Sequence, residues 1–155
     1  MIRICVFSDS HGSPEPMIAA LEREMPTLFF FLGDGERDLR PVRKRFPDLP
    51  CYGVRGNCDL RSELSRSVVC TVVGVRIFAV HGHLHNVKYE PELDTLAAAA
   101  GEAGAGLVLF GHTHQPLLRE LHGITFLNPG SIGGRGDYAV LELEDGRFTA
   151  ELKIL

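Results

Sequence analysis

Residues 2–12 read IRICVFSDSHG, an apolar run that stops abruptly in a polar turn containing Asp9 and His11. The same pattern, an apolar run followed by a polar turn, occurs four more times along the chain. Apolar runs at 27–32, 51–54, 76–80 and 107–110 each end in a turn that contains glycine. Short runs of this kind, rich in Val, Ile and Phe, are typical of buried strands. The sequence therefore predicts five strands, each followed by a polar loop.

Helical patterns lie between these strands, at residues 16–25, 38–46 and 91–103. In the last of them, Leu93, Leu96, Ala97 and Ala100 share one face, and Pro91 suits a first helical turn. Strands that alternate with helices imply crossover connections and a largely parallel sheet.

The C-terminal part has a different pattern. Gly74-Val75 joins the runs 67–73 and 76–80 as a hairpin, and beyond His114 only strands are indicated, at 117–121, 124–127, 138–143 and 147–154. Asp145-Gly146 is a strong hairpin turn. Antiparallel strands are expected here. We predict one α/β domain over residues 1–155, with two packed mixed β-sheets flanked by helices.

Composition and charge argue against nucleic-acid and membrane functions. The net charge of the 155 residues is −4 and there is no long basic run, which argues against non-specific nucleic-acid binding and leaves nucleic acid only as a substrate end. No apolar stretch is long enough to span a bilayer, and the N-terminal run is too short for a signal peptide. We expect a cytoplasmic protein with no membrane partner, whose exposed sheet edges allow a homo-oligomer.

The polar turns gather seven potential metal ligands. Each follows a predicted strand at its carboxyl end, and such ends meet at one edge of an open parallel sheet, where ligands bind. Seven donors are too many for one transition metal, but they suit two ions about 3.5–4 Å apart that share a carboxylate and a water or hydroxide. The seven residues are Asp9, His11, Asp34, Asn57, His81, His112 and His114.

Spacing and neighbouring residues add detail to these ligands. Asp9 and His11, like His112 and His114, stand two residues apart, so in an extended segment each pair can hold one ion. A glycine precedes three of the ligands and permits a sharp turn there; these are Gly33, Gly56 and Gly111. Carboxylate and imidazole donors suit Mn, Fe, Co, Ni or Zn, and we favour Mn.

Together these motifs resemble the calcineurin-like metallophosphoesterase superfamily in their order and spacing, from residue 4 to about residue 136. They are Asp9-x-His11, Gly33-Asp34, Gly56-Asn57, His81-Gly82-His83 and Gly111-His112-Thr113-His114. The compact size and Asn128-Pro129-Gly130-Ser131 resemble its small bacterial and archaeal phosphodiesterase branch. The resemblance implies two packed β-sheets flanked by helices, a small phosphate-ester substrate, and hydrolysis by a hydroxide that bridges two ions.

The resemblance also implies roles for individual residues. Asp9, His11 and His114 would hold the first metal, and Asp34 would bridge the two ions. The second metal would lie on Asn57, His81 and His112.

The sequence departs from the family at Cys58, where many members have a histidine that assists the leaving group. A thiol, with an ordinary pKa of about 8.5, is a weaker proton donor at neutral pH than an imidazolium. We therefore expect alkyl phosphate monoesters to be poor substrates and diesters with good leaving groups to be better ones. His83 or His85 could supply the missing proton, so the catalytic candidates are Asn57, Cys58 and His83.

Basic residues outside the motifs leave two interpretations open. A cluster follows the Asp34 turn, and a solvated helix face is favoured over steering of an anionic substrate; it consists of Arg37, Arg40, Arg43, Lys44 and Arg45. Arg135, in a glycine-rich loop, either binds a substrate phosphate or lies on the surface.

Three functions remain in competition. The first is a metal-dependent phosphodiesterase. The second is a non-catalytic metal-binding scaffold, because one eukaryotic branch of the superfamily has eroded metal motifs and serves as a protein-interaction subunit. The third is a phosphomonoesterase or phosphoprotein phosphatase, which the short chain and Cys58 disfavour.

Overall fold

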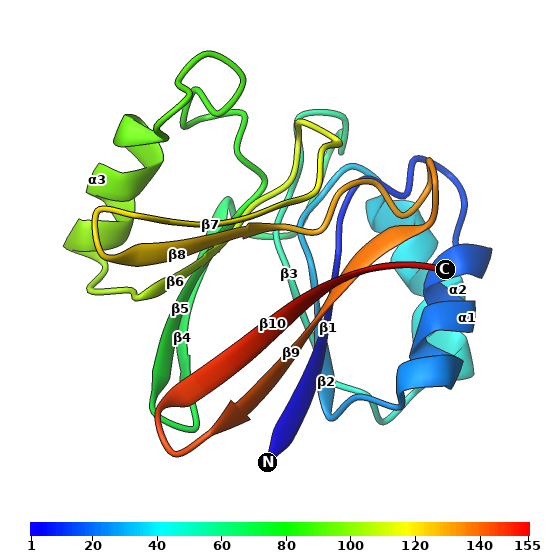
Figure 1. Ribbon diagram of the computed structural model, residues 1–155. Helices are drawn as coiled ribbons and strands as arrows, with labels where there is room; N and C mark the ends of the chain where they lie inside the picture. The colour runs from blue at the N-terminus through cyan, green and yellow to red at the C-terminus, as the bar shows by residue number, and fades with distance from the viewer.

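The computed structural model describes residues 1–155 and has two five-stranded sheets packed together (Figure 1). The strand order of the first sheet is β10 (Arg147–Ile154), β9 (Asp137–Glu144), β1 (Ile2–Phe7), β2 (Leu28–Phe31) and β3 (Cys51–Gly53). The strand order of the second sheet is β4 (Ser67–Val72), β5 (Val75–Val80), β6 (Leu107–Leu109), β8 (Ile124–Asn128) and β7 (Leu117–Leu121). The predicted α/β class with two packed mixed sheets is confirmed.

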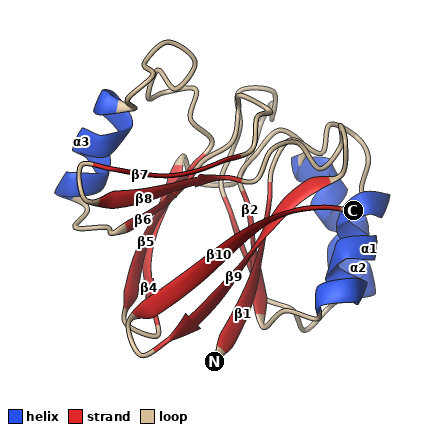
Figure 2. Ribbon diagram, viewed as in Figure 1, coloured by secondary structure: helices blue, strands red, loops and turns tan.

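Helices cover the outer faces of both sheets (Figure 2). The first sheet is covered by α1 (Glu15–Glu24) and by α2 (Leu39–Arg45), which follows the short 3-10 helix η1 (Glu36–Asp38). The second sheet is covered by α3 (Asp94–Glu102). None of these helices combines the length and the apolar character that a membrane crossing requires.

Strand alternation places the core on both faces of each central strand. In β1, Ile4 and Val6 point into the apolar layer between the two sheets, whereas Cys5 and Phe7 pack toward α1. In β5, Ile77 belongs to the layer between the sheets and its neighbour Phe78 to the layer under α3. Because side chains alternate across a strand, a continuous apolar run serves two cores at once.

Strand direction brings the polar turns to one end of the molecule. β1, β2 and β3 are parallel, as are β5, β6 and β8, and the parallel arrangement predicted for the N-terminal part is confirmed. β9, β10 and β7 are antiparallel to their neighbours, as predicted, but β8 pairs in parallel with β6 as well as antiparallel with β7.

Most predicted boundaries differ from the structure by a residue or two, and two of the differences have clear local causes. The hairpin turns at Val73 and Gly74, both with positive φ, so β5 begins one residue earlier than predicted. The helix predicted from Pro91 begins at Asp94, because Leu93 is left-handed (φ 53°) and buried in the core. The Glu90 carboxylate accepts hydrogen bonds from the N–H and the hydroxyl of Thr95 and so fixes this start.

Candidate metal centre

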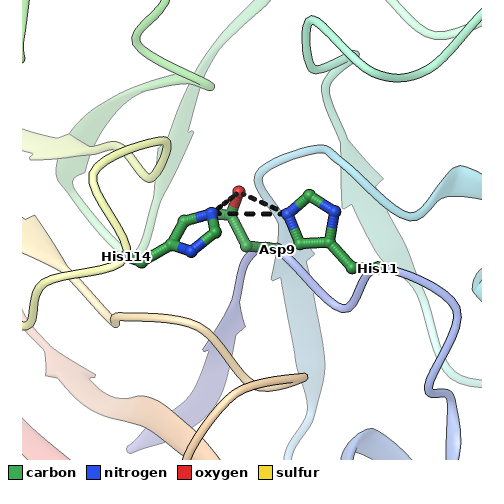
Figure 3. A group of neighbouring side chains, drawn as sticks. All are labelled: Asp9, His11 and His114. Atoms are coloured by element: carbon green, nitrogen blue, oxygen red, sulfur yellow. Dashed lines mark hydrogen bonds and ion pairs between the residues drawn. The ribbon is translucent and has the colours of Figure 1, made fainter.

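The loops after β1 and β6 bring together a first group of donors, Asp9, His11 and His114 (Figure 3). Oδ1 of Asp9 lies 3.4 Å from Nε2 of His11 and 3.2 Å from Nε2 of His114. The two Nε2 atoms are 3.3 Å apart. All three donor atoms thus point toward a common position.

A second group, Asp34, His81 and His112, comes from the loops after β2, β5 and β6. Nε2 of His81 lies 3.3 Å from Oδ2 of Asp34 and 3.2 Å from Nδ1 of His112. The same Oδ2 of Asp34 is 3.9 Å from Nε2 of His11, which belongs to the first group. Asp34 therefore lies between the two groups, as a shared ligand must.

These donor sets fit divalent metal ions. Oδ1 of Asp9 is buried and has no hydrogen-bond partner, which is costly for a carboxylate oxygen unless a cation satisfies it. Donor atoms that sit about 2.1 Å from one ion lie roughly 3.0–3.4 Å apart in octahedral or tetrahedral geometry. The separations of 3.2–3.4 Å within the first group agree with that spacing.

An unusual backbone conformation aims most of these side chains. Five of the seven predicted ligands have positive φ: Asp9 (56°), His11 (44°), Asp34 (61°), His112 (69°) and His114 (62°). Residues other than glycine adopt this left-handed conformation infrequently, and it clusters at functional sites. The extended geometry predicted for the pairs at i and i+2 is therefore wrong. Tight left-handed turns, and not strand alternation, direct the donors inward.

The two pairs also differ in what they hold. Asp9 and His11 belong to one group, as expected, but His112 and His114 are divided between the two groups. The expectation that each pair holds one ion is thus wrong for His112 and His114. One loop contributes a donor to each group.

The glycines that precede ligands act in two ways. Gly33 has a φ of 103°, which favours glycine, as predicted. Gly56 and Gly111 do not have positive φ, but a Cβ atom on Gly56 would overlap Oδ1 of Asp34, and one on Gly111 would overlap Oγ of Ser8. Close packing of the loops, rather than a sharp turn, explains these two.

Neighbouring groups hold the donors in position. Nδ1–H of His81 donates to the carbonyl oxygen of Leu32 over 2.6 Å, which leaves Nε2 with a free lone pair for a metal. Oδ2 of Asp9 accepts hydrogen bonds from the Ser8 hydroxyl and from the backbone N–H of His112. Asp9 thus turns its other oxygen, Oδ1, toward the histidines.

The pKa values describe the centre without a metal. Burial alone would lower the pKa of His81, but contact with Asp34 and the charge of Asp9 raise it above its ordinary value. Burial and the neighbouring His81 lower the pKa of His112 to about 4. Burial opposes ionisation of Asp34, yet hydrogen bonds from His81 and the Cys58 N–H bring its pKa below the usual range. A positive charge is thus favoured between the two carboxylates.

Sequence reasoning missed a residue that organises the centre, Asp59. Its buried carboxylate accepts four backbone N–H groups, from Asp34, Gly35, Glu36 and Gly56. It therefore ties the loop that carries Asp34 to the loop that carries Asn57. An aspartate at the end of a glycine-initiated turn was the available signal, because aspartate often caps nearby backbone N–H groups.

The motif Asn128-Pro129-Gly130-Ser131 forms a turn beside the two donor groups. Nδ2 of Asn128 donates to the carbonyl oxygen of Gly111 and to Oγ1 of Thr113. The Ser131 hydroxyl donates to the carbonyl oxygen of Asp9. The motif thus braces the loops of both donor groups.

The remaining candidates lie around the six clustered donors. Asn57 is exposed, and its Nδ2 contacts Sγ of Cys58 at 3.5 Å. Cys58 lies beside His11 and Asp34, and burial together with the Asp34 charge raises the pKa of its thiol. The ring of His83 is 5.5 Å from that of His81, whereas His85 packs on the edge of Phe78.

Arg135 lies in the loop whose Gly133 N–H donates to the carbonyl oxygen of Asp9. Its Nε and Nη2 both donate to the carboxylate of Asp137. A contact between Arg135 and a substrate phosphate stays a prediction.

Comparisons with known proteins agree with this geometry. Residues 2–146 match the family described as the calcineurin-like phosphoesterase superfamily domain. The probable metallophosphoesterase YsnB of Bacillus subtilis (strain 168) is 31% identical over 154 residues, which cover 96% of this chain and 88% of that protein. Phosphodiesterase YfcE of Escherichia coli (strain K12) is 25% identical over an alignment that covers 92% and 88% of the two chains.

A solved structure extends the similarity to the whole fold. Vps29 of Entamoeba histolytica, crystallised in complex with zinc, superposes with a TM-score of 0.77 at 20% sequence identity, covering 99% of each chain. At this identity the likeness concerns the fold.

Proposed function

The chain belongs to the calcineurin-like phosphoesterase superfamily, and on that basis we propose that it is a phosphodiesterase that works with two divalent metal ions. The observation that carries the proposal is the position of Asp34, whose Oδ2 lies near both His81 and His11. The phosphodiesterase name of its relative YfcE supports diesters as substrates. Mn is the favoured metal, and Ni, Fe, Co and Zn suit the same donors.

In this proposal each donor group would hold one ion. Asp9, His11 and His114 would hold the first, and Asp34 would serve both. His81, His112 and Asn57, whose exposed amide would turn inward, would hold the second. When bound, the two ions supply a nucleophile from water at neutral pH and neutralise charge on the phosphate.

The chain's own contribution is preorganisation. The Leu32 carbonyl fixes the tautomer of His81, and Asp59 fixes the loop of Asp34 through backbone N–H groups. Ligands held by such outer partners keep their geometry before the substrate arrives, so little reorganisation remains for the reaction.

The leaving group determines which esters are cleaved. Cys58 lies beside Asp34 and His11, and the pKa of its thiol is raised, so it stays protonated and is a weak proton donor. Aryl diesters, whose leaving groups depart without a proton, should therefore be cleaved faster than alkyl monoesters. His83, next to His81, is the candidate for a further contact to the leaving group.

The test combines metal content with two substrates. We expect the purified protein to bind two Mn ions per chain and to hydrolyse bis(4-nitrophenyl) phosphate faster than glycerol 3-phosphate. His122, an exposed histidine outside both groups, provides the control His122→Ala, which should retain full activity. Protein that stays inactive with Mn, Ni, Co and Zn would overturn the proposal, and faster turnover of glycerol 3-phosphate would overturn the diester preference.

A non-catalytic scaffold is the second candidate, and a relative named vacuolar protein sorting-associated protein 29, from Schizosaccharomyces pombe (strain 972 / ATCC 24843) and 34% identical over 57% of this chain, supports it. The same measurements distinguish the two. A chain that binds metal ions but hydrolyses neither the diester nor the monoester would be assigned to the scaffold class.

A further inference from the structure

Three adjoining hollows extend from the candidate metal centre across the surface formed by η1, α2 and the loop that follows β3. The first, of about 340 Å³, is lined by ligands His11 and Asp34 together with Cys58. The second, of about 460 Å³, shares Arg37 and Leu60 with the first. The third, of about 300 Å³, shares Leu60 with both others and reaches His83. Because they share walls, they form one groove that starts at the metal ligands.

Six arginines line this groove, although the chain as a whole carries a net charge of −4. Arginines elsewhere, such as Arg3, Arg45 and Arg135, form ion pairs with carboxylates. No ion pair joins a carboxylate to any of the six, which are Arg37, Arg40, Arg43, Arg55, Arg61 and Arg66. We call this surface the arginine groove.

The walls also hold five carboxylates, one fewer than the arginines, and none of them is ion-paired with an arginine of the groove; they are Asp34, Glu36, Asp38, Asp59 and Glu63. Asp38 is buried and accepts hydrogen bonds from Ser10 and Gly12, and Asp59 is held by four backbone N–H groups. Only Glu36 and Glu63 remain with no hydrogen-bonded side chain. Unpaired guanidinium groups that surround a hollow repel one another, and a bound anion would remove that repulsion.

The basic cluster that follows the Asp34 turn divides into two parts. Arg37, Arg40 and Arg43 recur at intervals of three along η1 and α2, and all three line the groove. Arg45 points elsewhere and pairs with Glu22 on α1. Arg37, Arg40 and Arg43 are exposed as well as lining the hollow, so the solvated helix face favoured from the sequence and a role in binding an anion both stay predictions.

We propose that the arginine groove binds a second phosphate group of the substrate. The substrate is then a nucleotide-sized phosphodiester that carries a further phosphate, an assignment that rests on the proposed phosphodiesterase function. The hollows have the size of small-molecule sites, roughly 300–1,000 Å³. Apart from the imidazoles of His11 and His83, no aromatic side chain lines them, whereas single-stranded nucleic acid is usually bound by aromatic stacking. The chemistry favours a small phosphorylated molecule over a nucleic-acid strand.

A matched pair of chromogenic substrates tests this assignment. Thymidine 3′-(4-nitrophenyl phosphate) is compared with the same compound bearing a 5′-phosphate. Charge-assisted hydrogen bonds contribute about 1.5–3 kcal/mol, so the 5′-phosphate should raise kcat/KM by about tenfold or more, mainly by lowering KM. The triple variant Arg37→Gln, Arg40→Gln and Arg61→Gln should lose most of this advantage.

Two controls make the result specific. Bis(4-nitrophenyl) phosphate, which has no second phosphate, is the reference substrate: the triple variant should lose a much larger factor in kcat/KM on the 5′-phosphorylated ester than on this diester, and circular dichroism checks that the variant is folded. Arg147→Gln removes an arginine that lacks an ion pair and lies at the β9–β10 hairpin, outside the groove, and should keep the full advantage of the 5′-phosphate.

Four outcomes would overturn the proposal. Equal kcat/KM for the two thymidine esters, or an advantage that persists in the triple variant, would reject the arginine groove while leaving the phosphodiesterase function intact. Competition by a thymidine oligonucleotide at lower concentration than by thymidine 3′,5′-bisphosphate would reassign the groove to nucleic acid. No hydrolysis of any diester would reject the proposed function and, with it, the substrate assignment.

Discussion

Glu24 and Asp9 are both buried carboxylates, but the chain satisfies them in different ways. Glu24, at the end of α1, accepts hydrogen bonds from Arg3, Lys153 and Tyr138. Oδ1 of Asp9 has no hydrogen-bond partner and faces only imidazole nitrogens. A buried charge is costly unless it is paired. The chain's own Arg3 and Lys153 pair with Glu24, whereas the Asp9 carboxylate requires a bound cation.

The largest effect on activity is expected at Asp34, the proposed shared ligand. Asp34→Asn keeps the side-chain shape and an oxygen that can accept the N–H of Cys58, but it removes the charge between the two donor groups. Two-metal sites contribute several kcal/mol of transition-state stabilisation, so kcat for bis(4-nitrophenyl) phosphate should fall by about 10³-fold or more. Steady-state kinetics with saturating Mn measures this, and bound Mn should fall in parallel.

The matched control removes the charge of the other buried carboxylate. Glu24→Gln should retain its kcat per folded molecule, because Glu24 contacts no metal ligand. An Asp34→Asn protein that is fully active, or a folded Glu24→Gln protein that is inactive, would contradict the division between a metal centre and a structural ion cluster.

Glu24→Gln should lower the stability of the fold, although it leaves the activity unchanged. The three partners outweigh the effect of burial and lower the pKa of Glu24 from 4.5 to about 2. Because the folded-state pKa is depressed, this stabilisation is present above pH 4.5 and is lost as the pH falls toward 2. Glu24→Gln should therefore cost about 3 kcal/mol of unfolding free energy at pH 7.

Urea denaturation at a series of pH values measures this difference. It should shrink steadily between pH 4.5 and pH 2. A difference that stays constant across this range would show that lost packing, and not the charge of Glu24, stabilises the fold.

Metal addition should stabilise the fold through the carboxylates that the chain leaves unpaired. Mn at 100 times its dissociation constant should add about 2.7 kcal/mol to the free energy of unfolding for each site filled. Wild type and Glu24→Gln should gain equally, whereas Asp9→Asn, which loses a donor of the first group, should gain less. Thermal unfolding with and without Mn tests this, and an equal gain in Asp9→Asn would place the ion away from Asp9.

Sequence reasoning predicted the strands and the ligands because both leave strong local signals. The apolar runs of β1, β5 and β6 are buried on two faces, and Asp9, His81 and His112 follow these strands within three residues. It did not predict where the helix after Pro91 begins, because that start depends on a left-handed Leu93 and on the Glu90 side chain. The division of the C-terminal strands between two sheets depends on long-range pairing, such as that of β9 with β1.

Within the candidate site, the identity of the donors was more predictable than their geometry. The types and spacing of Asp9, His11, His112 and His114 indicated metal ligands, but no local sequence pattern predicted that all four adopt positive φ. The role of Asp59 was likewise hidden, because three of its four N–H partners lie 23 to 25 residues earlier in the chain. Contacts between distant loops, absent from any local pattern, complete this site.

Asp137 is a third buried carboxylate and lies between the two extremes. Its side chain is 2% exposed, and its cation, Arg135, is 68% exposed. Nε and Nη2 of Arg135 donate to Asp137, and Nη1 has no protein partner, so the pair can hold Arg135 in place while Nη1 stays free for a substrate phosphate. If Arg135 contacts the phosphate, Arg135→Gln should raise KM for bis(4-nitrophenyl) phosphate by about tenfold or more and leave kcat unchanged, because a hydrogen bond to a charged group contributes about 1.5–3 kcal/mol. The free energy of unfolding should also fall, because the buried Asp137 carboxylate loses its side-chain hydrogen-bond partner. Arg147→Gln serves as the control for loss of one positive charge. An unchanged KM, accompanied by a loss of stability, would assign Arg135 to Asp137 alone and group that carboxylate with Glu24 rather than with the metal centre.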